Sequence, residues 1–380
     1  MHICYITGEY PTQCKTHGGV GTFVQTIGRA LVAQGFKVSV VGIGTEDSQT
    51  LDEGVAVYTV SRNKLPKIGA FLSAIKLNRC IKQIHKANAI DVVESNEAGL
   101  ALLKKIKGIQ YIIRMHGGHH FFTKYENRAL EKSKAFLEKK SFAKADVILA
   151  VSNFVGQETK QMLGLKLPIT TIYNPIHTKN FPEAKSDTVV SNRLLFVGTV
   201  CEKKGIRQLA QAFPKVKERF PDATLQIVGR DWRFPDGRSY TDYLKTYIRP
   251  EDTEAITIVG PVPHTEIPKY ISEAAVCVYP SHMEAMPLAW LEVLSMGKPF
   301  VASAIGPGYE AVKDGITGLL CNPQSPEDIA EKVIWMLQHP VEAQQMGKNA
   351  RKDILQRFDV EVILKQNIDF YQSIANGFSN

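Results

Sequence analysis

Short, nearly continuous apolar runs alternate along the chain with longer segments whose apolar residues recur at helical spacing. Runs of this kind are typical of parallel strands that helices cover on both faces. The alternation occurs twice and predicts two doubly wound α/β domains. In the first half the predicted strands are residues 2–7, 37–43, 91–95, 111–116, 146–152 and 169–173; in the second half they are 193–198, 224–229, 256–260, 276–280, 299–303 and 318–321.

The stretch 174–192 separates the two halves. It lacks strong periodicity and contains two prolines, as connections between domains often do. We therefore predict one domain over residues 1–175 and a second over 176–358. The remaining residues, 359–380, are predicted to be helical, and such a helix has to cover apolar surface. A chain of 380 residues is also too long for a single core.

The composition is that of a soluble globular protein, with 44% hydrophobic and 22% charged residues. No apolar run is long enough to span a bilayer. The first residues, MHICYITGEYP, are typical of a buried strand and not of a signal peptide. The six cysteines show neither paired nor metal-type spacing. Together these features predict a cytoplasmic protein.

The net charge of +8 is concentrated in the first 173 residues, which contain 23 Lys and Arg against 13 Asp and Glu. Residues 54–90 contain no acid at all. Within them, residues 67–86 combine apolar positions near helical spacing with flanking cations. This pattern predicts either an ordinary helix packed on the sheet or a basic amphipathic helix at an anionic membrane surface, which would make the protein peripheral to the inner face of the membrane. Nucleic-acid binding is disfavoured because aromatic residues are not interleaved with the cations.

The segment 281–320 contains the strongest candidates for ligand-binding residues. There Glu284 follows a predicted strand, and Glu292 lies in a helix predicted to open at Pro287. Carboxylates accept paired hydrogen bonds from vicinal hydroxyls, and the free amides at a helix start suit a diphosphate. Two glutamates at this spacing are common on protein surfaces, but these two have apolar neighbours, where charges are expected to have partners.

Three further segments carry candidate chemistry. The glycine-rich segment 17–35 follows the first strand but lacks the third glycine of a dinucleotide fingerprint, and a plain turn is the alternative interpretation. The segment 114–120, RMHGGHH, begins at the carboxyl end of a predicted strand; no acid or cysteine lies near its histidines, so a metal site is not predicted. In 193–213, Lys203 and Lys204 precede a helix, where cations oppose the helix dipole unless an anion is bound.

The glutamate spacing, the glycine-rich segment and the Lys204-Gly205 pair resemble the motifs of retaining glycosyltransferases, most closely family 4, and the resemblance covers essentially the whole chain. It implies the GT-B fold: two Rossmann-like domains facing a cleft, with the C-terminal helix crossing back to the first domain. It also implies transfer of a sugar from a nucleotide-diphosphate sugar to a hydroxyl acceptor such as a glycan, a polysaccharide precursor or a lipid-linked saccharide. No cofactor or metal is expected, since the chain contains no Asp-x-Asp.

The resemblance also assigns residues to roles. Where the family usually has an arginine, this chain has Thr199, and Lys203 and Arg230 are the candidate replacements. A sugar-nucleotide epimerase of the same fold and a non-catalytic sugar-nucleotide-binding regulator remain as alternatives. The implied catalytic residues are His116, Glu284 and Lys204; the donor-binding residues are Gly19, Lys204, Arg230, Glu284, Met286, Leu288, Ala289 and Glu292; the acceptor-side residues are His119 and His120, for which a purely structural loop role is the alternative.

Overall fold

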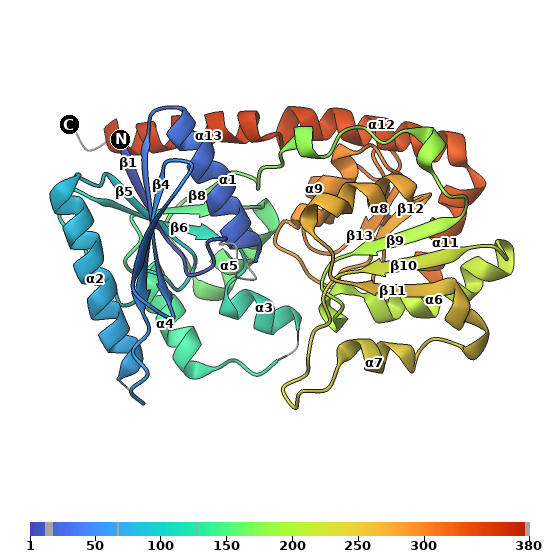
Figure 1. Cartoon of the computed structure of the whole chain (residues 1–380), viewed down its shortest axis with the longest axis horizontal. Helices are drawn as coiled ribbons and strands as arrows, with labels where there is room; N and C mark the ends of the chain where they lie inside the picture. The colour runs from blue at the N-terminus through green and yellow to red at the C-terminus, as the bar shows by residue number, and fades with distance from the viewer. Residues whose placement is uncertain (12–17, 67, 127, 377–380) are drawn as a thin grey trace. The chain divides into compact units, whose positions relative to one another are not determined.

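A computed structural model describes residues 1–11, 18–66, 68–126 and 128–376 of the chain. The chain forms two compact units (Figure 1). Unit 1 comprises Met1–Pro175 together with Val360–Asn380, and unit 2 comprises Ile176–Asp359. The last helix, α13 (Val360–Asn376), is therefore part of the first unit, as the fold prediction required.

The sheet of unit 1 has the strand order β3-β4-β2-β1-β5-β6-β7-β8. β3 is antiparallel to β4, and the other neighbours are parallel. The chain leaves β1 in one direction and later returns to its other side, so the strand order reverses between β1 and β5. The strands are β1 (His2–Ile6), β2 (Lys37–Gly44), β3 (Ser48–Asp52), β4 (Val55–Ser61), β5 (Val92–Ser95), β6 (Gln110–Met115), β7 (Val147–Ala150) and β8 (Ile169–Thr171).

The β3–β4 hairpin was not predicted. β3 is mostly exposed at the edge of the sheet, and β4 mixes buried with half-buried residues, so neither forms a continuous apolar run. Glu53 and Gly54 both have positive φ, 46° and 87°, which is the backbone of a two-residue hairpin turn. The turn therefore depends on local conformation more than on hydrophobicity.

Helices cover the sheet of unit 1, and α1 and α13 contact each other on it (Figure 1). A buried polar network joins α13 to the strands. Arg114, 1% exposed, donates from Nε to Glu94 Oε1 at 2.7 Å and from Nη2 to Asn367 Oδ1 at 2.6 Å. The Tyr371 hydroxyl donates to Glu94 Oε2 at 2.8 Å. The helices are α1 (Gly19–Ala33), α2 (Gly69–Ala87), α3 (His119–Tyr125), α4 (Lys132–Phe142), α5 (Asn153–Leu163) and α13.

Unit 2 has a fully parallel sheet of order β11-β10-β9-β12-β13-β14. Here the order reverses between β9 and β12, which makes the carboxyl ends of these two strands the usual place for a ligand. The strands are β9 (Arg193–Val197), β10 (Thr224–Val228), β11 (Ile256–Gly260), β12 (Val276–Tyr279), β13 (Phe300–Ser303) and β14 (Leu319–Cys321); the helices are α6 (Ile206–Arg219), α7 (Tyr240–Lys245), α8 (Ile267–Glu273), α9 (Leu288–Ser295), α10 (Gly308–Ala311), α11 (Pro326–Gln338) and α12 (Pro340–Arg357).

The prediction of two doubly wound α/β domains is confirmed. Each predicted parallel strand is present, with ends shifted by one or two residues at most sites, as is usual for boundaries. Within the described residues, no helix combines the length and the apolarity needed to cross a membrane.

Candidate active site

The central feature of unit 2 is a partly buried ion pair where the strand order reverses. Lys204 ends a short 3-10 turn after β9, and Glu284 lies in the loop after β12. The Lys204 ammonium group donates to Glu284 Oε1. Two residues predicted separately are thus brought together by the topology of the sheet.

Backbone contacts fix these two segments against each other. The His282 amide donates to the Lys203 carbonyl at 2.8 Å. Gly205 has φ of 67°, and a Cβ placed there would lie 1.8 Å from the Pro280 carbonyl oxygen. Only glycine fits at that approach. The backbone that carries Lys204 is therefore fixed by its packing against the loop after β12.

Glu284 is only 7% exposed. Burial would raise the pKa of this carboxyl group, but the nearby charges of Lys204 and Lys203 outweigh it and hold the pKa below its ordinary value. Glu284 is therefore ionised at neutral pH. A buried carboxylate of this kind can accept hydrogen bonds from a ligand hydroxyl while Lys204 offers charge to an anionic group.

The turn that carries Lys204 is anchored by Glu202, which the sequence analysis did not identify. The Glu202 carboxylate accepts hydrogen bonds from Arg207 at 2.7 Å, Gln208 at 3.1 Å and the Tyr240 hydroxyl at 2.6 Å. Burial opposes ionisation, but these donors outweigh it and lower the pKa of Glu202 to about 2. Glu202 is thus a structural anion that holds the start of α6.

Glu292 lies on α9 and is 7% exposed. Its Oε1 is 2.9 Å from Nε2 of His264, which follows β11. The hydrogen bond to Glu292 raises the pKa of His264 although burial acts against it. His264 was not predicted, and no local pattern in the sequence distinguishes it. The pair shows that the Glu292 carboxylate points toward a polar surface and not into the core.

α9 begins at Leu288, one residue later than predicted, because Pro287 is the N-cap with extended backbone angles. Leu288 and Ala289 are therefore the first two helical residues, whose amides have no acceptor within the helix. Met286 is buried in the loop just before the helix. The predicted donor-binding residues of this segment lie together at the carboxyl edge of the sheet.

Arg230 lies beside Thr199, the position where the family usually has an arginine. The Arg230 Nε donates to Thr199 Oγ1 at 3.3 Å. The segments that carry Thr199 and Arg230 approach each other closely at Gly198 and Gly229, since a Cβ on Gly229 would lie 1.9 Å from the Gly198 carbonyl oxygen. The exposed guanidinium group of Arg230, two residues after β10, thus lies next to the position of the missing arginine.

In unit 1, His116 follows β6 directly. Its amide donates to Glu97 Oε1 at 2.6 Å, and the Gly117 amide donates to the same oxygen at 2.7 Å. The imidazole ring meets the edge of Phe23 at a centroid distance of 5.2 Å. Burial first, and the Arg114 charge second, lower the pKa of His116 to about 3. The imidazole is therefore neutral at physiological pH and able to donate or accept one hydrogen bond.

His119 and His120 open helix α3, so their assignment to a loop was wrong. His119 Nε2 accepts a hydrogen bond from the Glu131 amide at 3.0 Å. His120 is buried, and both its amide and its Nδ1 bond to Glu138 Oε2. These contacts give both histidines a structural role within unit 1.

Glu97 and Glu138 are two buried acids that the sequence analysis missed. A Cβ on Gly118 would lie 1.7 Å from Glu138 Oε1 and 2.9 Å from Glu97 Cγ, so the two side chains flank the same glycine. Burial, reinforced by Glu138, raises the pKa of Glu97 to about 7 despite its backbone hydrogen bonds. Glu97 lies two residues after β5. Its position just beyond a predicted strand was the only feature of the sequence that could have marked it as a candidate site residue.

Gly19 is the first residue of α1 and is exposed, and no atom of the described residues lies within 4 Å of its Cβ position. Gly21 in the same helix is closely packed, because a Cβ there would lie 1.8 Å from the Glu9 carbonyl oxygen. The preceding residues 12–17 lie outside the described part of the chain. Among the described residues, no group of three or more His, Cys, Asp or Glu side chains is arranged to hold a metal ion.

Two doubly wound units, with the last helix returned to the first, define the GT-B class of glycosyltransferases. Residues 17–180 match the family model Glycosyltransferase Family 4, and residues 180–353 match the model Glycosyl transferases group 1. The chain belongs to glycosyltransferase family 4, and it is an enzyme of the hexosyltransferase type.

Several characterised proteins are similar over the whole chain. Glycogen synthase of Mycobacterium tuberculosis is 26% identical, with 99% of this chain and 96% of the relative covered. Sucrose-phosphate synthase from Thermosynechococcus elongatus superposes with a TM-score of 0.85 at 22% identity, over 99% of both chains. HepE of Anabaena, solved in complex with UDP-glucose, has a TM-score of 0.78 at 18% identity, over 98% of this chain and 100% of that one. These likenesses confirm the predicted fold.

Proposed function

We propose that the enzyme is a retaining glycosyltransferase that moves a hexose from a nucleotide-diphosphate sugar to a hydroxyl acceptor. The observation that carries the proposal is the partly buried Lys204–Glu284 pair where the strand order of unit 2 reverses. A cation for the diphosphate and an ionised acceptor for sugar hydroxyls are the two groups that such a donor requires. HepE was solved with UDP-glucose, which makes UDP-glucose the first donor to test.

In this proposal Glu292 accepts hydrogen bonds from the ribose hydroxyls and Glu284 accepts one from a hydroxyl of the donor sugar. Lys204 and the free amides of Leu288 and Ala289 neutralise the diphosphate. Arg230 supplies the charge that the family arginine provides elsewhere. The supporting observations are the burial of both glutamates and the position of both amides in the first turn of α9.

The proposed reaction exchanges one bond for another on the same face of the sugar. The bond from the anomeric carbon to the phosphate oxygen breaks, and a bond from that carbon to the acceptor oxygen forms. The acceptor proton passes to the departing phosphate oxygen. Catalysis then depends on positioning and on charge stabilisation, to which Lys204 contributes at the leaving group. On the acceptor side we assign His116, whose neutral imidazole is suited to hydrogen bonding.

Mass spectrometry after incubation with UDP-, GDP- and ADP-sugars tests the proposal, with a panel of saccharide and lipid-linked acceptors. Release of the nucleotide diphosphate together with a glycoside that keeps the donor's anomeric configuration is the expected result. An epimerase would instead return an intact sugar nucleotide of altered configuration. Binding of a sugar nucleotide without turnover of any donor or acceptor in the panel would indicate a non-catalytic regulator.

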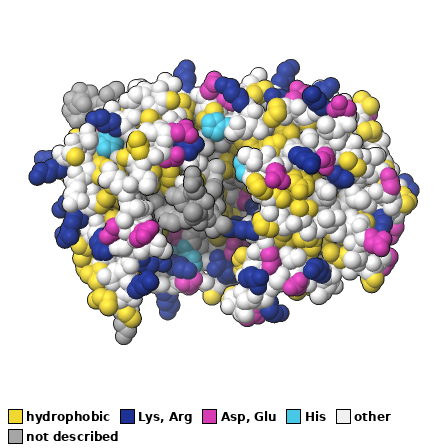
Figure 2. All heavy atoms as spheres, viewed as in Figure 1, with side chains coloured by type: hydrophobic (Ala, Val, Ile, Leu, Met, Phe, Trp, Pro, Cys, Tyr) yellow, Lys and Arg dark blue, Asp and Glu magenta, His cyan; other side chains and the backbone are white. Residues whose placement is uncertain are grey.

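Helix α2 offers a second proposal, namely contact with an anionic membrane. Its inner face packs on the sheet, so the interpretation as an ordinary domain helix is correct for that face. Its outer face and the preceding turn expose apolar side chains: Leu65 is 54% exposed, Ile68 53%, Phe71 61% and Ile75 41%. Figure 2 shows apolar side chains gathered at the lower left, over the start of α2, with Lys and Arg side chains further along that edge. Exposed apolar residues beside cations favour an anionic lipid surface.

A further inference from the structure

Unit 1 contains a cavity of about 480 Å³, within the usual range for small-molecule sites. It lies at the carboxyl ends of β1, β2 and β5, where the strand order of unit 1 reverses, and α2 covers it. Except for Gly19, the proposed donor-binding residues lie in unit 2. Gly19 lies in unit 1 but does not line this cavity. The residues that line this cavity are therefore different from those assigned to the donor.

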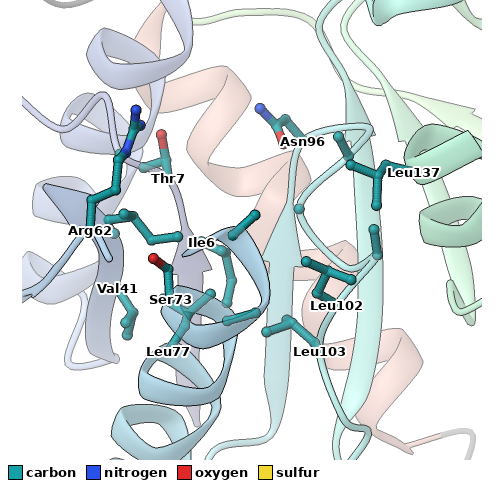
Figure 3. Close-up of a pocket in the computed structure, with 18 of the residues that line it drawn as sticks. Ile6, Thr7, Val41, Arg62, Ser73, Leu77, Asn96, Leu102, Leu103 and Leu137 are labelled. Atoms are coloured by element: carbon teal, nitrogen blue, oxygen red, sulfur yellow. The ribbon is translucent and has the colours of Figure 1, made fainter. Parts of the chain in front are cut away.

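The lining of the cavity is mostly apolar, and in Figure 3 Leu137 lies beside the polar Asn96. Figure 3 shows Arg62, Thr7 and Asn96 at one end, with Leu77, Leu102 and Leu103 at the other. Small residues on α2 and after β5, Ala70 and Ala98 among them, leave the space open. Among the described residues that line it, none is acidic. A ligand that fits has an apolar body and a polar or anionic head.

Two polar side chains at the opening of the cavity, Arg62 and Asn96, are available to bind a ligand. Within the described part of the chain, neither the Arg62 guanidinium nor the Asn96 side-chain amide has a hydrogen bond or ion pair. Ser73, by contrast, is buried deeper in the same wall and is satisfied, donating to the Gly69 carbonyl and accepting from the Asn63 amide. Arg62 also lies in the acid-free stretch 54–90. An unpaired guanidinium group in such surroundings is suited to a phosphate or carboxylate.

We propose that this cavity binds the aliphatic part of an amphiphilic acceptor whose anionic group is held by Arg62 and Asn96. The hydrocarbon chain lies against Leu77, Leu102 and Leu103, which exclude water from it. This inference rests on the proposed function, since it names the acceptor class of the same enzyme: a lipid-linked, negatively charged acceptor. A free saccharide would gain little from a leucine-lined wall.

Calorimetry with decyl phosphate, below its micelle concentration, tests the binding step without any donor. Arg62→Gln removes the charge and Ala98→Trp fills the mouth; each is expected to weaken binding at least tenfold. Both positions are exposed, so neither change requires repacking of the core. The matched controls are Lys64→Gln, an exposed cation outside the lining, and Ala87→Trp at the end of α2; both should bind as the parent does. Inorganic phosphate alone should bind far more weakly, since it lacks the chain.

Equal affinity of all four variants would overturn the inference. So would loss of binding in Phe71→Ser with retention in Ala98→Trp, because the amphiphile would then lie on the outer face of α2. Transfer assays separate this inference from the proposed function. Sugar transfer to a lipid-linked acceptor, unaffected by Ala98→Trp, would remove the cavity from the reaction and leave the glycosyltransferase proposal standing. Amphiphile binding without turnover of any sugar nucleotide would count against the proposed reaction alone.

Discussion

The substitution Glu97→Gln should make unit 1 more stable at alkaline pH and leave it little changed at acidic pH. Glu97 is buried, and its pKa is raised from 4.5 to about 7. Below pH 4.5 the carboxyl group is protonated in both the folded and the unfolded chain, so folding carries no penalty from its ionisation. Between pH 4.5 and 7 the unfolded chain loses the proton and the folded chain keeps it. Stability therefore falls as pH rises through this window.

The size of the effect follows from the shift. A difference of about 2.5 pKa units corresponds to roughly 3 kcal/mol, fully lost above pH 7. Glutamine removes the charge but keeps an oxygen that accepts from the His116 and Gly117 amides. The variant should therefore gain up to about 3 kcal/mol over the parent at pH 8, or roughly 6–12 °C in the melting temperature of a unit of this size.

Thermal melts at pH 5 and pH 8, with hydrogen exchange of peptides from residues 95–120, measure the difference within unit 1. Glu46→Gln, at an exposed glutamate of the same unit, is the control and should show no such dependence. Parallel curves of stability against pH for the parent and Glu97→Gln would refute the reasoning. A variant less stable at both pH values would mean that the charged hydrogen bonds outweigh the cost of burial.

Three further outcomes are expected. Glu292→Gln should weaken binding of a nucleotide diphosphate about tenfold, since charged hydrogen bonds contribute roughly 1.5–3 kcal/mol; unchanged affinity in calorimetry, with an intact fold, would remove Glu292 from the donor site. Turnover should be independent of divalent cations because Lys204 supplies the charge; loss of activity in EDTA and its return with magnesium or manganese would contradict this role. Flotation with anionic vesicles should show binding that falls with salt and with Lys76→Glu, Arg79→Glu and Lys82→Glu; absence of binding at low salt would exclude the membrane surface.

The fold could be predicted largely because buried parallel strands leave a strong local signal. Most of these runs are apolar over most of their length, and most are separated from the next by a helix. The β3–β4 hairpin lacks that signal, because β3 is exposed and β4 is only half-buried. Its turn depends on positive φ at Glu53 and Gly54. The sequence Asp52-Glu53-Gly54 does not by itself predict a hairpin turn.

The candidate site was predictable only in part, because its contacts join distant residues. Lys204 and Glu284 could each be identified from their surroundings, but their ion pair depends on the strand order of unit 2. His264 gave no local signal, since its importance derives from Glu292, 28 residues later in the chain. Glu97 and Glu138 likewise acquire their roles only when β5 and α4 meet around Gly118. Long-range packing, and not residue type, determines these functions.

The network around Arg114 has a consequence for how the protein is made. The ribosome releases the strands that carry Arg114 and Glu94 long before their partners Asn367 and Tyr371, which lie more than 250 residues later in the chain. All of unit 2 is synthesised in between. Until then a buried guanidinium group and a carboxylate lack part of their hydrogen bonding, which is costly in an apolar setting. The first unit is therefore expected to finish folding only after α13 has left the ribosome, and a nascent chain stalled before α13 should remain a client of chaperones.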